Sequence, residues 1–284
     1  MKIAGIPLVV LICSAALPCV GQPRKSVFLV TDGEGVAGMC RQDQVEPPGP
    51  ELKQLLTGEV NAAVEGFLAG GADEVVVWDG HDGSQTLSAA TIHERAKLII
   101  GDIYPLMTFE RRYAALAFVG QHSLAGTAAA IMAHSYNSLG IENMRLNGKP
   151  VGEIEITAAL AGSFGTPVIF LSGDRAAASE LHAIVPDAVT AEVKEGLARY
   201  SCITLSAAAA RTLIRDRAMA AARKIGSIQP YRINGPVTLE IEYTTRNSLS
   251  YSARSDPGRE VVDDRTIRIH GKDLEEAWTR YRAR

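Results

Sequence analysis

The sequence has little of several features that identify common classes of protein. Only 6% of its 284 residues are aromatic, and its 29 basic and 32 acidic residues leave a net charge of −3. A charge so close to neutral gives no indication of a nucleic-acid partner or of binding to an anionic membrane surface. Internal repeats and low-complexity tracts are also absent from the sequence, so a repeat architecture is not expected.

Cysteine is also scarce. Of the four cysteines, Cys13 and Cys19 lie in an N-terminal segment that we expect to be removed, which leaves Cys40 and Cys202. Two cysteines so far apart do not form a disulfide framework. They could pair in an oxidising compartment, or each could be a small buried apolar residue.

The N-terminal segment has the features of a Sec-type signal peptide. Lys2 provides a positive start, Ile3–Leu17 is apolar and uncharged, and small residues up to Gly21 offer a cleavage site. The apolar stretch is shorter than the about 20 residues of a membrane span. We therefore predict a signal peptide at residues 1–21 and a periplasmic or secreted protein. A lipoprotein anchor at Cys19 and an uncleaved N-terminal anchor are alternatives.

Strand and helix patterns alternate up to about Asp174, which indicates a largely parallel α/β sheet. The short apolar runs Val27–Val30 and Glu74–Trp78 are typical of parallel strands covered on both faces. Between them, Glu51–Leu68 has apolar residues at helical spacing. Further along, Val237–Tyr243 alternates polar and apolar residues, as half-exposed antiparallel strands do.

These patterns predict an α/β fold, with a largely parallel sheet flanked by helices and a smaller C-terminal α+β subdomain. We expect an α/β domain at residues 22–188 and the subdomain at residues 189–284, with the boundary near Val185–Val193.

The first predicted strand ends in an acidic loop. Asp32 and Glu34 stand one residue apart between glycines, which allow the main chain to direct both carboxylates to one point. Ligands of α/β proteins bind at this edge of the sheet, and divalent cations favour such oxygen donors. Taken alone, the same residues are also typical of a polar turn after a strand.

Three later segments add metal-type side chains at corresponding places. His81 follows the second strand, His122 follows the strand at Ala114–Gly120, and Glu153 begins the helix after an Asn-Gly hairpin turn. Because the carboxyl ends of parallel strands meet at one edge, these side chains can join the acidic loop. Two histidines and three carboxylates suit Zn²⁺ or a similar ion. Five ligands exceed the three of a mononuclear catalytic zinc and suit a two-metal site.

Five short motifs occur in a fixed order along the chain: Thr-Asp-Gly-Glu-Gly at 31–35, Asp-Gly-His at 79–81, Gly-Gln-His at 120–122, Ala-His-Ser at 133–135 and Val-Gly-Glu at 151–153. This ordered set resembles the zinc-dependent D-aminopeptidase family, which has an acidic S-x-D-x-E-G box, later histidine ligands, and V-G-E before a helix. The resemblance extends over roughly residues 26–174.

The resemblance implies a role for each of six residues. Asp32 would bridge two zinc ions, Glu34 and His81 would complete one side, His122 and Glu153 would complete the other, and His134 would match the family's proposed catalytic histidine. It also implies two Zn²⁺ ions per subunit and ring-shaped homo-oligomers. The implied activity is removal of N-terminal D-amino acids from short peptides, typically those containing D-Ala.

The sequence departs from the family pattern at three positions. Thr31 replaces the serine of the acidic box, Trp78 stands where Asn is expected, and Asp82 follows the ligand histidine where Gly is usual. These departures leave open a metal-dependent amidohydrolase with another substrate, such as an L-peptide or a cell-wall fragment. Asp79 or Asp82 could orient a ligand imidazole. A periplasmic solute-binding protein, which would not need the five ligands, is a further alternative.

Overall fold

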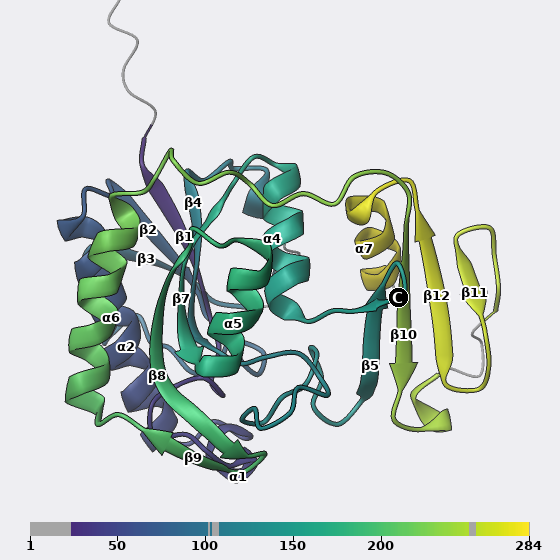
Figure 1. Cartoon of the computed structure of the whole chain (residues 1–284), viewed down its shortest axis with the longest axis horizontal. Coiled ribbons are helices and arrows are strands. Elements are labelled where there is room, and N and C mark those ends of the chain that lie inside the picture. Colours follow the sequence, from purple (N-terminus) through teal and green to yellow (C-terminus); the bar gives the residue numbers. More distant parts are fainter. Residues whose placement is uncertain (1–23, 102, 104–107, 250–253, 284) are drawn as a thin grey trace, which may run out of the picture.

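Two β-sheets divide the structure into a larger and a smaller part (Figure 1). The computed structural model describes residues 24–101, 103, 108–249 and 254–283. The predicted signal peptide at residues 1–21 therefore lies outside the described residues. Within the described ranges, no helix combines the length and the apolar character needed to cross a membrane.

The larger sheet has seven strands in the order β3-β2-β1-β4-β7-β8-β9. Neighbouring strands are parallel except for the β8–β9 hairpin at one edge. The central strands are almost completely buried, as expected for apolar strands with helices on both faces. The strands are β1 (Ser26–Thr31), β2 (Glu74–Trp78), β3 (Ala96–Ile99), β4 (Ala115–Gln121), β7 (Val168–Asp174), β8 (Val189–Ala198) and β9 (Ser201–Thr204).

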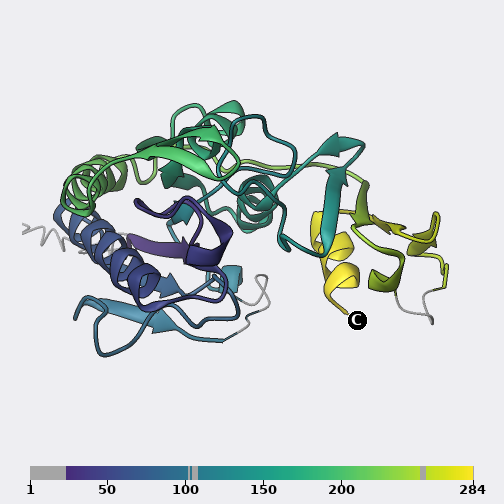
Figure 2. The ribbon, with the colours of Figure 1, turned by 90° about the horizontal axis from the view of Figure 1, so that it is seen from below.

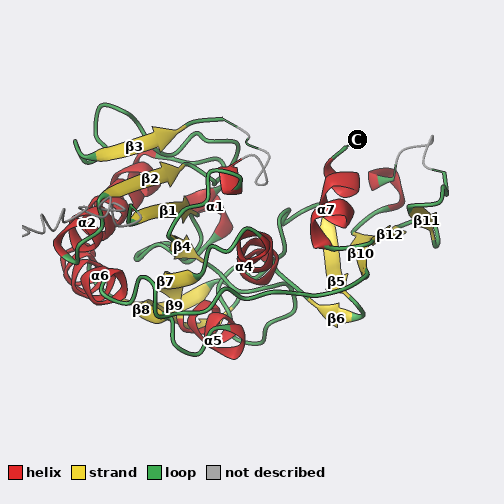
Figure 3. Cartoon of the chain, turned by 90° about the horizontal axis from the view of Figure 1, so that it is seen from above, coloured by secondary structure: helices red, strands yellow, loops and turns green. Residues whose placement is uncertain are grey.

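Helices cover both faces of this sheet (Figure 3). Helices α2 and α6 pack against each other on one face, while α4 and α5 lie on the other. The contact between α2 and α6 is close because Gly66 lies against the main chain of Arg215, where a side chain would collide. The helices of this part are α1 (Gln42–Val45), α2 (Pro50–Ala69), α4 (Glu153–Ser163), α5 (Arg175–Ile184) and α6 (Ala207–Ala222).

The smaller sheet is antiparallel, and helix α7 (Leu274–Arg282) packs against it (Figure 2). Leu239 and Ile241 of its central strand are buried, whereas Glu240 between them pairs with arginines of the neighbouring strands. This alternation is typical of a sheet with one face against a core. The strands, in spatial order, are β11 (Arg259–Val261), β12 (Thr266–Gly271), β10 (Val237–Tyr243), β5 (Ile141–Leu146) and β6 (Lys149–Pro150).

The predicted α/β fold, with a mostly parallel sheet flanked by helices, is confirmed. The segments that form each sheet nevertheless differ from the predicted division of the chain between residues 188 and 189. Strands β5 and β6 precede this point but belong to the smaller sheet, whereas β8, β9 and α6 follow it and complete the larger part. Local periodicity does not reveal such pairings, since β5 and β10 join residues 95 positions apart.

Candidate metal centre

The acidic loop after β1 is fixed against the ends of the neighbouring strands β2 and β4. The N–H of Gly35 donates to the carbonyl of Gly120 (2.7 Å). A side chain at residue 35 would collide with the main chain of Gln121, so this close approach requires glycine. The hydroxyl of Thr31 donates to the carbonyl of Trp78 (3.0 Å), which joins the start of the loop to the end of β2.

All six predicted site residues lie at this edge of the sheet. Nδ1 of His81 is 3.0 Å from Oδ1 of Asp32, and Nε2 of His122 is 3.3 Å from Oδ2 of the same carboxylate. Glu34 joins the first pair, with Oε2 3.3 Å from Nδ1 of His81. Glu153 joins the second pair, with Oε1 3.5 Å from Nε2 of His122. Asp32 therefore lies between two histidine–carboxylate pairs.

His134 reaches the same cluster from the loop that follows β4. Its ring stacks on the ring of His122 with a centroid separation of 4.0 Å, and its Nε2 is 4.0 Å from Oε1 of Glu34. The ligand atoms form two sets, and within each set they all lie within 4.8 Å of one another. One set belongs to Asp32, Glu34 and His81, and the other to His122, His134 and Glu153. The cluster thus contains two adjacent groups with the donor atoms of a metal site.

Main-chain carbonyls fix the orientation of all three imidazoles. The pairs are His81 Nε2 with the Val45 carbonyl (3.0 Å), His122 Nδ1 with the Ser123 carbonyl (2.9 Å) and His134 Nδ1 with the Met132 carbonyl (2.8 Å). A carbonyl oxygen can only accept a hydrogen bond, so each of these nitrogens carries a proton. The other nitrogen of a neutral ring then presents a lone pair to the carboxylates, as in metal-ligating histidines.

Two buried atoms of the cluster have no hydrogen-bond partner. They are Oε2 of Glu34 and Nε2 of His122, which belong to side chains that are almost completely buried. Leaving a buried polar atom without a partner costs about 1–3 kcal/mol, and more for a charged group. A cation between the two histidine–carboxylate pairs would satisfy both atoms. The donor set therefore fits a divalent ion such as Zn²⁺.

The buried charges of the cluster shift its pKa values in different directions. Burial raises the pKa of Asp32 to about 7, and the charge of Glu34 adds to this effect. Burial disfavours the charged form of His81, but the adjacent carboxylates of Asp32 and Glu34 outweigh burial and raise its pKa to about 12. Burial, together with the adjacent His122, lowers the pKa of His134. The carboxylates therefore require positive charge close by, which a proton or a metal ion can supply.

Further contacts hold the carboxylates in place. The side-chain amide of Gln121 donates to Oδ2 of Asp32 (2.9 Å), and the N–H of Tyr136 donates to Oε1 of Glu153 (2.7 Å). Asp79 does not orient His81, contrary to one of the expectations above. Its carboxylate instead accepts hydrogen bonds from the segment after the histidine, including the N–H groups of residues 86 and 87 (both 2.9 Å).

A cavity of about 360 Å³ opens beside the cluster. Apolar side chains such as Phe28 and Phe118 form part of its wall. Glu46 also lines the cavity: a carboxylate oxygen lies within 4.8 Å of ligand atoms of Glu34 and His134, and Oε2 accepts a hydrogen bond from Ser138 (3.0 Å). The sequence did not predict Glu46 as a site residue, because it lies in a proline-containing loop without metal-ligand spacing.

Comparisons with known proteins agree with this geometry. Residues 26–283 match the sequence model of a peptidase family described as D-aminopeptidase. The chain is 28% identical over 259 residues to a D-aminopeptidase of Bacillus subtilis (strain 168), an alignment that covers 89% of this chain and 93% of that protein.

A solved structure from the same organism is also similar. It is described as the Zn-dependent D-aminopeptidase DppA from Bacillus subtilis, a self-compartmentalizing protease. Its TM-score to this chain is 0.79 at 26% sequence identity, with 89% of this chain and 94% of that chain covered. Because the family match extends over nearly all of the sequence beyond residue 25, the predicted family is confirmed: this chain belongs to the D-aminopeptidase family of peptidases.

Proposed function

We propose that this chain is an exported aminopeptidase that holds two zinc ions and removes N-terminal D-amino acids from short peptides, D-Ala peptides in particular. One observation carries the proposal: the oxygens of Asp32 face different histidines, at 3.0 Å from His81 and 3.3 Å from His122. A carboxylate in this position is suited to bridge two ions about 3.5–4 Å apart.

The other proposed ligands are the two histidine–carboxylate pairs on either side of Asp32. Glu34 and His81 complete one side, and His122 and Glu153 complete the other. The fixed ring orientations support this assignment, because the nitrogens of His81 and His122 that face the carboxylates are free to bind metal once the rings are neutral.

His134 is proposed to act on the substrate rather than on a metal. When bound, a pair of zinc ions supplies Lewis acidity that lowers the pKa of water to about 7 and polarises the scissile carbonyl. The Met132 carbonyl holds Nδ1 of His134, so the orientation of the ring is fixed. Nε2 can then take up the proton that the attacking water loses and pass it to the leaving amine.

Glu46 is proposed to bind the free ammonium group of the substrate. Its carboxylate lines the cavity next to Glu34 and His134, where the N-terminus of a bound peptide would lie close to the reacting carbonyl. A charge-assisted hydrogen bond from this ammonium to Glu46 would favour peptides with a free N-terminus. Such a contact would limit the enzyme to the removal of terminal residues.

Export is supported by two independent features. The apolar segment before residue 22 has the pattern of a signal peptide. Cys40 and Cys202, whose pairing the sequence left open, form a disulfide, and disulfides persist in oxidising compartments. We therefore propose that the mature protein acts in the periplasm or outside the cell.

A ring-shaped homo-oligomer is part of the same proposal. The similar Bacillus subtilis protein is described as self-compartmentalizing. On the β8–β9 hairpin, Leu197, Tyr200 and Ile203 are 57%, 50% and 60% exposed, respectively. Exposed apolar clusters of this kind mark interaction surfaces, and a second copy of the chain would cover this one.

A metal-dependent amidohydrolase with a different substrate is the second candidate. Trp78 and Asp82, two of the positions that depart from the family pattern, line the cavity beside the cluster. They could favour an L-peptide or a cell-wall fragment. Family membership does not favour the solute-binding alternative.

Zinc content and stereochemical preference test the proposal together. We expect the purified protein to hold two zinc ions per chain by elemental analysis, and to hydrolyse D-Ala-D-Ala faster than L-Ala-L-Ala. The Glu34→Ala variant should lose both zinc and activity. Fewer than one bound ion per chain, or full activity of this variant, would contradict the metal site. A clear preference for the L-peptide would favour the second candidate.

A further inference from the structure

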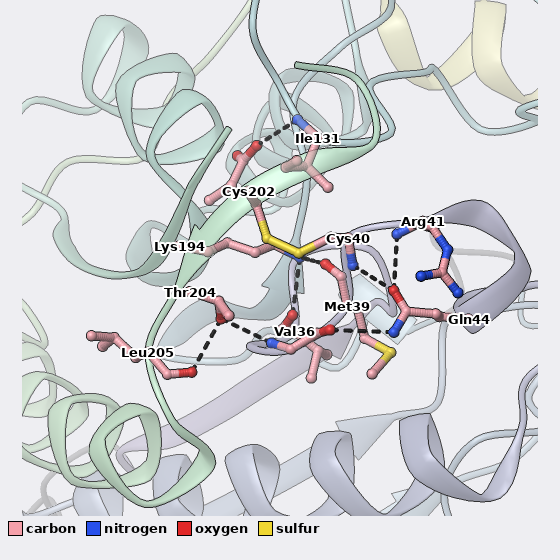
Figure 4. The surroundings of a disulfide bond; sticks show 12 residues. Val36, Met39, Cys40, Arg41, Gln44, Ile131, Lys194, Cys202, Thr204 and Leu205 are labelled. Atoms are coloured by element: carbon pink, nitrogen blue, oxygen red, sulfur yellow. Dashed lines mark hydrogen bonds between the residues drawn. A yellow bond between two sulfur atoms is a disulfide. The ribbon is translucent and has the colours of Figure 1, made fainter. Parts of the chain in front are cut away.

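A buried lysine contacts the main chain of the acidic loop. Lys194 of β8 is 4% exposed. Its ammonium donates to the carbonyl oxygens of Glu34, Val36 and Met39, at 2.9 Å for Val36. Figure 4 shows the contacts with Val36 and Met39. An ammonium has three N–H donors, and here all three are used on a single loop.

Burial of this charge requires compensation from its surroundings. Removing an ammonium from water costs several kcal/mol, and burial lowers the pKa of Lys194 to about 8. The neighbouring carboxylates of Asp174 and Glu59 oppose this effect. The carboxylates of Glu34 and Asp32 in the metal centre also contribute. Three carbonyl acceptors around one nitrogen are the surroundings that an ammonium, with three donors and no acceptor, requires.

The three carbonyls constrain the shape of the loop. Because all of them face one ammonium, residues 34–39 must curve around it, and the main chain of Glu34 is fixed where its side chain enters the metal centre. The N–H groups of the curved segment are used as well. Ala37 donates to Oε1 of Glu59, and Gly38 donates to Oγ1 of Thr204 (both 2.9 Å). The Cys40–Cys202 disulfide closes the end of the loop (Figure 4).

We propose that Lys194 is a positioning residue for the metal centre: its ammonium organises the acidic loop so that Glu34 is in place before metal binds. This inference rests on the proposed zinc site. Lys194 donates to main-chain oxygens and has no lone pair for a metal while it is charged, so it acts through the loop. Outer contacts of this kind typically change metal affinity by about 10–100-fold.

The test compares zinc affinity in Lys194→Met, which removes the charge and keeps the side-chain length, with affinity in wild type. We expect the zinc dissociation constant, measured by competition with a chelator, to rise about 10–100-fold. Val193→Ala is the matched control, because it removes a buried side chain from the same strand without contacting the loop carbonyls. The control should lower the melting temperature and leave zinc affinity unchanged. Wild-type affinity in Lys194→Met would overturn the inference.

A second measurement uses only the wild-type protein, so it does not depend on the folding of a variant. Hydrogen exchange of the zinc-free protein should show protection of the amides of Gly35, Ala37 and Gly38, which donate hydrogen bonds. Rapid exchange without zinc and protection only with zinc would mean that the metal organises the loop, which overturns the inference. If wild type binds no zinc at all, the proposed function fails instead.

Discussion

His122 and His134 stack on one another, yet their surroundings differ. Nε2 of His122 has two carboxylates within 3.5 Å, those of Asp32 and Glu153. Nε2 of His134 is farther from the carboxylate of Glu34, at 4.0 Å from Oε1. The shorter distances favour His122 as a metal ligand and leave His134 available to the substrate.

This difference predicts separate effects on zinc content and turnover. His134→Ala should retain two zinc ions per chain while kcat falls about 10²–10⁴-fold, the usual contribution of a general acid or base. His122→Ala should lose zinc as well as activity. Elemental analysis and steady-state kinetics on D-Ala-D-Ala would check both. Loss of zinc from His134→Ala would show that this histidine is itself a ligand.

The charge of Glu46 predicts how strongly the enzyme depends on a free N-terminus. Hydrogen bonds to charged groups contribute about 1.5–3 kcal/mol, so Glu46→Gln should lower kcat/KM by about 10–100-fold, mainly through KM. Ser138→Ala removes a hydrogen bond to Glu46 but keeps the carboxylate. Kinetics of this control should therefore change much less, and equal effects of the two variants would argue against an ammonium contact.

Local sequence predicts some residues of the candidate site and not others. The five predicted ligands can be recognised because each lies just after a strand, in a following loop or at the start of a helix, and such positions converge at one edge of a parallel sheet. His134 is predicted only from the family resemblance. Lys194 cannot be recognised in this way, because it lies 160 positions from Glu34, whose carbonyl it contacts. Its role depends on the pairing of β8 with β7 and on the burial that results.

At the level of elements, helix α2 contributes a buried carboxylate to the acidic loop. Glu59 is 2% exposed, and its Oε1 accepts a hydrogen bond from the N–H of Ala37 (2.9 Å). Burial raises the pKa of Glu59 to about 7, although this hydrogen bond and the charge of Lys194 oppose the shift. The contact between helix and loop therefore depends on pH.

The raised pKa predicts the direction of this dependence. The folded-state pKa of Glu59 is about 7 and the reference value is 4.5, so its contribution to stability is complete below pH 4.5 and is lost as the pH rises through 7. Glu59→Gln keeps an acceptor for Ala37 but cannot ionise. Its free energy of unfolding should match wild type near pH 4.5 and exceed it by up to about 3 kcal/mol at pH 8.

Urea denaturation between pH 4.5 and pH 8 would measure this difference. Glu65→Gln is a suitable control, because Glu65 is exposed on the same helix. The control should show no such trend, and a wild-type protein that gains stability relative to Glu59→Gln as the pH rises would contradict the assigned direction.

The disulfide joins two elements that are distant in sequence. Cys40 ends the acidic loop and Cys202 lies in β9, 162 positions further along the sequence. Because the crosslink closes so long a segment of the unfolded chain, the Cys40→Ser, Cys202→Ser double variant should lose about 2–5 kcal/mol of stability in chemical denaturation. A reducing agent should destabilise wild type to the same extent and leave the double variant unaffected. Equal stability of the oxidised and reduced wild-type protein would contradict this expectation.

At the level of the whole molecule, composition and periodicity predict the fold class but not the division into two sheets. The periodicity of Val237–Tyr243 correctly indicates a half-exposed antiparallel strand. It cannot indicate that β5, from the middle of the chain, is its partner. Such pairings depend on contacts made only when distant segments meet.

The exposed apolar side chains of the β8–β9 hairpin predict how the molecule assembles. Replacing Leu197 and Ile203 by glutamate would place charges in the proposed interface. Light scattering after size exclusion should then show a homo-oligomer for wild type and monomers for the double variant. Val262→Glu, in the smaller part and 37% exposed, should assemble as wild type does. An unchanged mass for the double variant would place the interface elsewhere.

The β8–β9 hairpin carries Lys194, which contacts the acidic loop, and also Leu197 and Ile203, which we assign to assembly. Two binding equilibria therefore share one structural element. Thermodynamic linkage requires that any factor by which assembly strengthens zinc binding equals the factor by which zinc strengthens assembly. In a coupled system of this kind, the concentration of free zinc would set the assembled fraction, and dilution of the oligomer would release zinc.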